Sequence, residues 1–137
     1  MVDLTDYCRA RAALLQDLRQ VCGEPALSPA RALGVLRAIA DFCDWEDAVL
    51  WPLVRDAAGA AVDLGPLCDD HSELRPVLRR LDDAVAAGSP EAAVLLRELC
   101  ERFGEHIEAE EREVLPALSA YVRPEDYAEA VSRRPAR

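Results

Sequence analysis

The chain has 137 residues, of which 51% are hydrophobic and 31% charged, a composition that favours a folded globular domain over a disordered one. The formal net charge is -10 and every cation is an arginine. Such an acidic balance argues against nucleic acid or an anionic membrane surface as a partner, and it is compatible with a bound metal cation. The five cysteines form no CxxC pair, and no apolar run reaches about 20 residues, so we expect a cytoplasmic protein without a disulfide framework or a membrane span.

Helices are predicted along the whole chain, because Ala, Leu, Arg and Glu dominate and no strand-like alternation of apolar residues occurs. Ser28-Pro29 and Ser89-Pro90 each place a capping residue before a proline, which is typical of a helix start. Four long helices with short connections predict an all-α, antiparallel up-down four-helix bundle in a single domain, residues 1–137. The predicted helices span residues 4–21, 29–57, 66–87 and 90–121, and a short helix follows at 125–131.

The second half of the chain repeats a pattern of the first half. Residues 11–18 align with residues 71–78, and residues 42–53 align with residues 106–117, so that a glutamate and a proline recur at matching positions. This self-similarity predicts two helical hairpins packed about a pseudo-two-fold axis. Side chains at the matching positions would then meet in the middle of the bundle.

Five charged or titratable side chains fall on the apolar stripes of these helices. His106 and Glu110 are four residues apart and so share one helix face. Arg11, Glu46 and His71 fall on the inward stripes of the other three long helices. Because an unpaired buried charge costs on the order of several kcal/mol, something must pair these groups. A divalent ion bound by Glu46, His71, His106 and Glu110 would do so, and this mixed N/O donor set suits iron(II), zinc or manganese.

The strings WEDAVLWP, DHSELRPVLRRL and HIEAEEREVLP resemble the hemerythrin-like (HHE cation-binding) domains, and the resemblance extends over residues 4–121. That family is a four-helix bundle that holds a non-haem di-iron centre. Its ligand pattern is a His on helix one, His-x-x-x-Glu on helix two, a His on helix three and His-x-x-x-Glu on helix four, with the two glutamates bridging the metals. The resemblance implies iron as the cofactor and dioxygen, nitric oxide or peroxide as ligands.

This chain departs from the family pattern in its first repeat, where the two histidine positions hold Arg11 and Phe42. In the family the missing pair of histidines serves one iron and the retained pair serves the other. The departure therefore implies a reduced, mononuclear centre with one ion, iron or zinc. Arg11 would replace the charge of the lost ion beside Glu46 and Glu110. Tyr7, one turn away, would either pack in the core or reach the centre as a phenol ligand or a hydrogen-bond donor.

Two classes of function stay open. In the first, the protein is a non-haem iron oxidoreductase that performs an oxidative step on a small molecule, because reversible dioxygen binding of the di-iron type requires two irons. In the second, the protein is a degenerate, metal-free four-helix scaffold that acts as a sensor or a protein-interaction module. In that case Arg11 forms ion pairs with Glu46 and Glu110, and the histidines hydrogen-bond to the same two carboxylates.

Other residues close to these motifs carry narrower expectations. Cys8 and Cys68 each lie three residues before a site position, so they either approach the centre or pack as small apolar side chains. Asp70 is expected to act as a helix N-terminal charge that the macrodipole favours. Trp45 is expected on the outer side of the second helix, where it would mark a partner surface.

Overall fold

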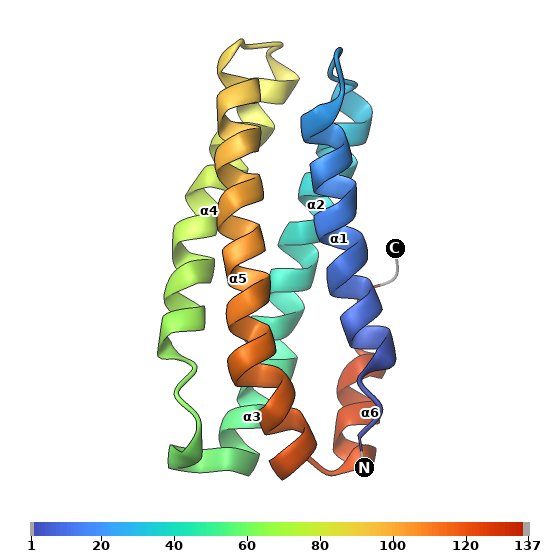
Figure 1. Ribbon diagram of the computed structural model, residues 1–137, viewed down its shortest axis with the longest axis vertical. Coiled ribbons are helices and arrows are strands. Elements are labelled where there is room, and N and C mark those ends of the chain that lie inside the picture. Colours follow the sequence, from blue (N-terminus) through green and yellow to red (C-terminus); the bar gives the residue numbers. More distant parts are fainter. Residues whose placement is uncertain (1, 136–137) are drawn as a thin grey trace.

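Residues 2–135 are described by the computed structural model, and helices are the only regular elements within that range. Four long helices run along the molecule, and two shorter ones lie at one of its ends (Figure 1). The helices are α1 (Thr5–Gly23), α2 (Pro29–Trp45), α3 (Trp51–Ala58), α4 (Gly65–Ala86), α5 (Glu91–Tyr121) and α6 (Pro124–Ser132), with a π-helix η1 (Glu46–Leu50) between α2 and α3 and a 3-10 turn η2 (Gly59–Ala61) after α3.

The long helices form a closed ring in which each packs on two neighbours: α1 on α2 and α5, and α4 on α2 and α5. Helices that follow one another in the ring run in opposite directions along the bundle (Figure 1). This arrangement confirms the predicted all-α, antiparallel up-down bundle with a short C-terminal helix. The segment predicted as one helix over residues 29–57 consists of α2, η1 and α3.

The helix ends follow the local signals in the sequence. The Ser28 hydroxyl accepts a hydrogen bond from the Arg31 backbone N–H at 3.4 Å, which caps α2 at its start. Gly88 has a φ of 65°, a left-handed conformation that glycine adopts without a steric penalty, and the chain turns there from α4 to α5. The Ser89 hydroxyl then accepts a hydrogen bond at 3.3 Å from the N–H of Glu91, the first residue of α5.

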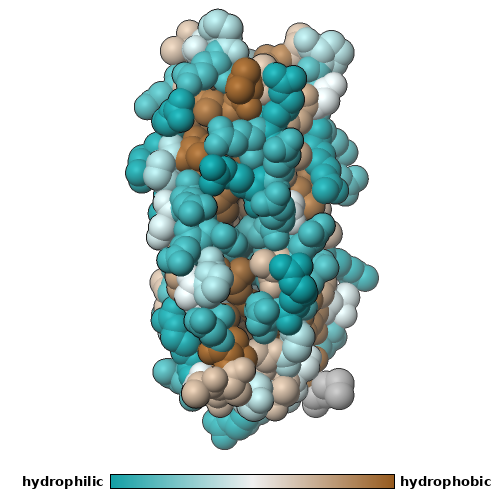
Figure 2. All heavy atoms as spheres, turned by 60° about the vertical axis from the view of Figure 1, so that its left-hand side comes forward, coloured by the Kyte–Doolittle hydropathy of each residue, from teal (hydrophilic) through white to brown (hydrophobic). Residues whose placement is uncertain are grey.

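Each long helix turns one apolar stripe toward the centre of the bundle. Leu14, Leu18, Ile39, Leu74 and Leu99 are all fully buried, and burying a side chain of this size contributes about 1.5–3 kcal/mol. Hydrophilic residues cover most of the face seen in Figure 2, with apolar side chains visible only in narrow strips between them. Within residues 2–135, no helix has both the length and the apolar character needed to cross a membrane.

Trp45 lies inside the molecule, so the expectation that it faces outward is wrong. Its side chain is 3% exposed, and its indole N–H donates a 2.9 Å hydrogen bond to the Ala130 carbonyl of α6. Helix α6 folds back against α3 and η1 at this end of the bundle. The surface that was expected to receive a partner is therefore covered by the chain's own C-terminal helix.

Candidate metal centre

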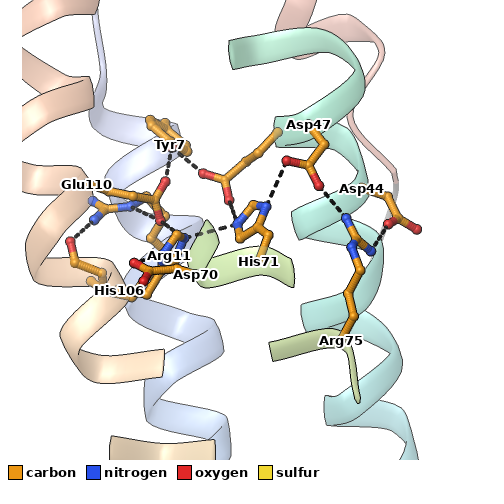
Figure 3. Close-up of polar contacts among 11 residues, drawn as sticks. Tyr7, Arg11, Asp44, Asp47, Asp70, His71, Arg75, His106 and Glu110 are labelled. Atoms are coloured by element: carbon orange, nitrogen blue, oxygen red, sulfur yellow. Dashed lines mark hydrogen bonds and ion pairs between the residues drawn. The ribbon is translucent and has the colours of Figure 1, made fainter. Parts of the chain in front are cut away.

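Five polar or charged side chains lie in the core of the bundle, each no more than 2% exposed. Arg11 comes from α1, Glu46 is the first residue of η1, His71 comes from α4, and His106 and Glu110 come from α5. All five side chains meet in one cluster, which is drawn in Figure 3. Three long helices and the π-helix that follows α2 therefore contribute to one polar site inside an otherwise apolar core.

Glu46 sits at a break in the α-helical hydrogen-bond pattern. The Trp51 backbone N–H bonds to the Glu46 carbonyl, an i to i+5 bond that defines the π-helix η1. Pro52 follows and has no N–H, so the α-helical bond to the carbonyl of Ala48 cannot form. Single π-turns of this kind occur often at functional sites. The Trp51 ring then stacks on the His71 ring at a centroid distance of 4.2 Å and fixes its orientation.

Three contacts between donor atoms of the site have lengths typical of neighbouring ligands of one metal ion. The Nε2 atoms of His71 and His106 are 3.0 Å apart. Glu46 Oε1 lies 3.4 Å from His71 Nε2, and Glu110 Oε1 lies 3.2 Å from His106 Nε2. Neighbouring ligand atoms around one ion with bonds of about 2.0–2.2 Å are about 3.0–3.5 Å apart. The three contacts fall in that range.

Two aspartates fix the tautomers of the histidines. Asp47 Oδ1 lies 2.9 Å from His71 Nδ1, and Asp70 Oδ2 lies 3.1 Å from His106 Nδ1 (Figure 3). An ionised carboxylate only accepts hydrogen bonds, so the proton of each neutral ring is on Nδ1. Both Nε2 atoms then present lone pairs to each other at 3.0 Å. Such a pair requires a cation between the rings, either a proton or a metal ion.

The hydrogen bonds of these aspartates to the histidines were not predicted from the sequence. Asp70 was assigned only to the helix dipole, and Asp47 was not considered. Each aspartate is next to a site residue in the sequence, Asp47 after Glu46 and Asp70 before His71. Each nevertheless contacts a histidine on a different helix. Carboxylates that hold the second ring nitrogen of a metal-binding histidine are common in metalloproteins, and adjacency to a site residue is the signal that could have found them.

We expect Asp70→Asn to weaken metal binding by about 10- to 100-fold, because the amide no longer holds the His106 Nδ1 proton as a carboxylate does. Isothermal titration of the metal-free protein with zinc measures the affinity. Asp69→Asn is the matched control, since it removes the same charge at an exposed neighbouring position. Equal affinities of the two variants would contradict the role assigned to Asp70.

The two histidines differ in their affinity for a proton. Burial, and then the neighbouring His106, lower the pKa of His71. Burial also opposes the charged form of His106, but the hydrogen bond and the negative charge of Glu110, together with Asp70, raise its pKa above the ordinary value. Of the two rings, His106 therefore holds a proton more tightly than His71.

The two glutamates are also unlike each other. Burial, and then the negative charge of Glu110, raise the pKa of Glu46 well above its ordinary range. Burial also disfavours ionised Glu110, but hydrogen bonds from Glu46 and His106 and the charge of Arg11 outweigh it and lower the pKa of Glu110 to about 2. Glu110 is thus the stronger acid of the pair and Glu46 the weaker one.

Tyr7 bridges the two carboxyl groups. Its Oη lies 2.6 Å from Glu46 Oε2 and 2.6 Å from Glu110 Oε2. A phenol has a single proton, so its O–H donates to one of the two carboxyl groups at a time. Burial, followed by the two neighbouring carboxyl groups, raises the pKa of Tyr7 well above its ordinary value, so the phenol stays protonated.

The side of the cluster formed by the first repeat holds a cation and aromatic rings instead of histidines. Arg11 Nε lies 3.7 Å from Glu110 Oε1, and Arg11 Nη2 donates a 2.6 Å hydrogen bond to the Ile107 carbonyl. The Phe42 ring stacks on the Tyr7 ring at 5.9 Å. The positive charge of Arg11 is therefore fixed beside Glu110, and Phe42 offers no ligand atom.

The buried donors form two overlapping sets of three. Glu46, His106 and Glu110 form one set and Cys43, Glu46 and His71 the other, and within each set the ligand atoms lie within 4.8 Å of one another. Glu46 belongs to both sets. Burial, and then the charges of Glu46 and Glu110, raise the pKa of the Cys43 thiol well above its usual range.

Cys43 was not singled out from the sequence, where attention fell on Cys8 and Cys68. In the part of the chain that the structure describes, neither of these two belongs to a donor set. The thiol of Cys68 instead contacts Arg55 Nη2 at 3.2 Å. The signal for Cys43 was its spacing, because a residue three positions before Glu46 shares a helix face with it.

A helical bundle with buried imidazole and carboxylate groups at its centre defines the molecule as a cation-binding helical protein. Residues 4–118 match the family described as the hemerythrin HHE cation binding domain. The chain belongs to this family, which confirms the resemblance inferred from the sequence motifs. No curated protein and no solved structure was found to match the chain.

Proposed function

We propose that the protein binds a single non-haem metal ion, iron or zinc, through Glu46, His71, His106 and Glu110. The observation that supports this most is the pair of Nε2 atoms, 3.0 Å apart and both turned into the core. Aspartates hold the opposite ring nitrogens, as they do for metal-ligating histidines. The donor set of two imidazoles and two carboxylates fits iron(II) or zinc.

The contrast between the two halves of the cluster supports one ion over two. Glu46 and Glu110 each turn Oε1 toward a histidine and Oε2 toward Tyr7. The permanently charged Arg11 guanidinium lies over the Tyr7 ring and 3.7 Å from Glu110 Oε1, and it occupies the position that the repeat equates with His71. A buried arginine beside Glu110 neutralises the carboxylate and repels a second cation.

We further propose that the centre handles dioxygen, nitric oxide or peroxide, or supports an oxidative step on a small molecule. Iron(II) in a two-histidine-plus-carboxylate set with an open position supplies oxygen-activating chemistry. Tyr7 holds a proton at Oη within the cluster, and the Trp51 and Phe103 rings pack beside the histidines and exclude water. A polar surface hollow of about 420 Å³, lined in part by Asp70 and His106, gives a small polar ligand a way in.

The rival function is a metal-free scaffold that binds a partner protein or senses a signal. One observation favours it: protons and Arg11 can balance the charge of the cluster, since His106 and Glu46 both have raised pKa values. Under this alternative the cluster is a hydrogen-bonded core, and the zinc or iron affinity of the protein is no greater than that of an ordinary acidic surface.

Metal content decides between the two functions. We expect protein purified without chelator to contain one iron or zinc ion per chain by elemental analysis. At a free zinc concentration of about 100 times Kd, the metal-stripped protein should gain about 2.7 kcal/mol of unfolding free energy. Glu110→Gln should abolish this gain, whereas Glu108→Gln, at an exposed position on the same helix, should retain it.

The scaffold function is supported if the purified protein contains no metal and its melting temperature does not respond to zinc or iron(II). The redox part of the proposal has its own test, which is the addition of nitric oxide to the anaerobic iron(II) protein. A new visible absorption band from an iron nitrosyl supports an open coordination position. Stoichiometric iron without such a band argues for a closed metal site.

A further inference from the structure

One buried donor is not used by the proposed four-ligand set. Cys43 lies on α2, three residues before Glu46, and its side chain is 1% exposed. Helix α2 packs against α4, which carries His71. The Cys43 Sγ, a Glu46 carboxylate oxygen and a His71 ring nitrogen all lie within 4.8 Å of one another. The thiol thus lies beside the centre.

The spacing of this second set is close to what one ion can bridge. Two ligand atoms on opposite sides of an ion, with bonds of about 2.0–2.3 Å, are about 4.0–4.6 Å apart. The donor atoms of the Cys43 set all lie within 4.8 Å of one another, an upper bound close to that separation. Because Glu46 belongs to both sets, an ion bound between Glu46 and His71 has the Cys43 thiol within reach as a further donor.

The other cysteines with described contacts are engaged elsewhere. Cys68 contacts Arg55, and Cys22 of α1 hydrogen-bonds to Cys100 of α5. Cys43 is the cysteine that shares a helix face with a ligand and packs against a second one. Because Cys43 lies beside Glu46 and His71, its thiol has a possible role other than core packing.

We propose that Cys43 is a thiolate ligand of the metal ion, an inference that rests on the single-ion function proposed above. When the metal–sulfur bond forms, the thiol releases its proton to solvent, so one proton leaves for each Cys43 that binds. A thiolate is a soft donor, and it makes the site select zinc, iron(II) or cobalt(II) over manganese(II) and magnesium. The centre is therefore a mixed sulfur, nitrogen and oxygen site.

Cobalt(II) loading of the metal-stripped protein tests the proposal through absorption spectroscopy. We expect an intense thiolate-to-cobalt charge-transfer band in the near ultraviolet for the wild type. Cys43→Ser should bind cobalt(II) without this band. Cys22→Ser is the matched control, since it removes a half-buried thiol from α1, and it should keep the band at full intensity.

Zinc X-ray absorption gives a second measurement that needs no variant. Sulfur at about 2.3 Å is distinguished from nitrogen and oxygen at about 2.0–2.2 Å, so the wild-type zinc protein should show one sulfur scatterer per ion. This keeps the proposal testable even if Cys43→Ser does not fold.

The possible results distinguish failure of the Cys43 ligand assignment from failure of the single-ion function. If cobalt(II) or zinc binds without the band and without a sulfur scatterer, Cys43 is not a ligand and the single-ion function still stands. A band that persists in Cys43→Ser also overturns the assignment. If neither metal binds the wild type, the proposed function fails and the ligand assignment fails with it.

Discussion

Arg11→Met is expected to lower the unfolding free energy of the metal-free protein by about 3–5 kcal/mol, as removal of one partner of a buried ion pair does. The Arg11 side chain is 2% exposed, lies 3.7 Å from Glu110 and donates a 2.6 Å hydrogen bond to the Ile107 carbonyl. Methionine retains most of the apolar length of the side chain. What is lost is the cation, which leaves a buried carboxylate and a buried carbonyl without their partner.

Urea denaturation in the presence of a chelator measures this effect. Arg9→Met is the control, because Arg9 is an exposed arginine on the same helix, and its replacement should change stability by about 0.5 kcal/mol or less. The double variant Arg11→Met, Glu110→Gln should recover part of the loss, since it removes both charges. If Arg11→Met is as mild as Arg9→Met, the ion pair with Glu110 does not support the metal-free fold.

The four-helix bundle was predictable because the signals that define its helices are local in the sequence. Apolar residues at helical spacing define each long helix, and signals such as Ser28 before a proline define where helices start. The internal repeat then orders the helices into two hairpins. The main error, at Trp45, arose because α6 folds back against η1 and α3 and accepts the Trp45 hydrogen bond. Periodicity within one helix contains no information about a short helix that covers its end.

The site was predictable only in part, because some of its contacts lie within one helix and others depend on how two helices pack. His106 and Glu110 lie one turn apart on one helix, so their spacing alone places them together. Asp47 and Asp70 contact histidines across helix boundaries, and those contacts depend on the rotation of neighbouring helices. The π-turn at Glu46 likewise depends on how a proline is accommodated, which helix propensity does not encode.

The two sides of the centre differ in their ligands, and a double substitution that adds two histidines should remove this difference. Glu46 and Glu110 each present Oε2 to the Tyr7 side, 2.6 Å from its Oη. That side therefore contains two carboxylate oxygens and a phenol oxygen, and in place of imidazoles it has Arg11 and Phe42. We expect Arg11→His combined with Phe42→His to raise the metal content from one to two ions per chain, because the variant removes the repelling cation and adds two nitrogen donors.

Elemental analysis after anaerobic loading with iron(II) and gel filtration measures the stoichiometry. The control is Arg11→Gln combined with Phe42→Leu, which also removes the cation and the aromatic ring but adds no imidazole, and it should remain at one ion. Two ions in the wild type would contradict the proposal that the position beside Arg11 and Phe42 holds no metal. One ion in the histidine variant would mean that Tyr7 and the surrounding core exclude a second metal. A rise to two ions in the histidine variant alone would show that two side chains on this backbone determine whether the centre is mononuclear or dinuclear.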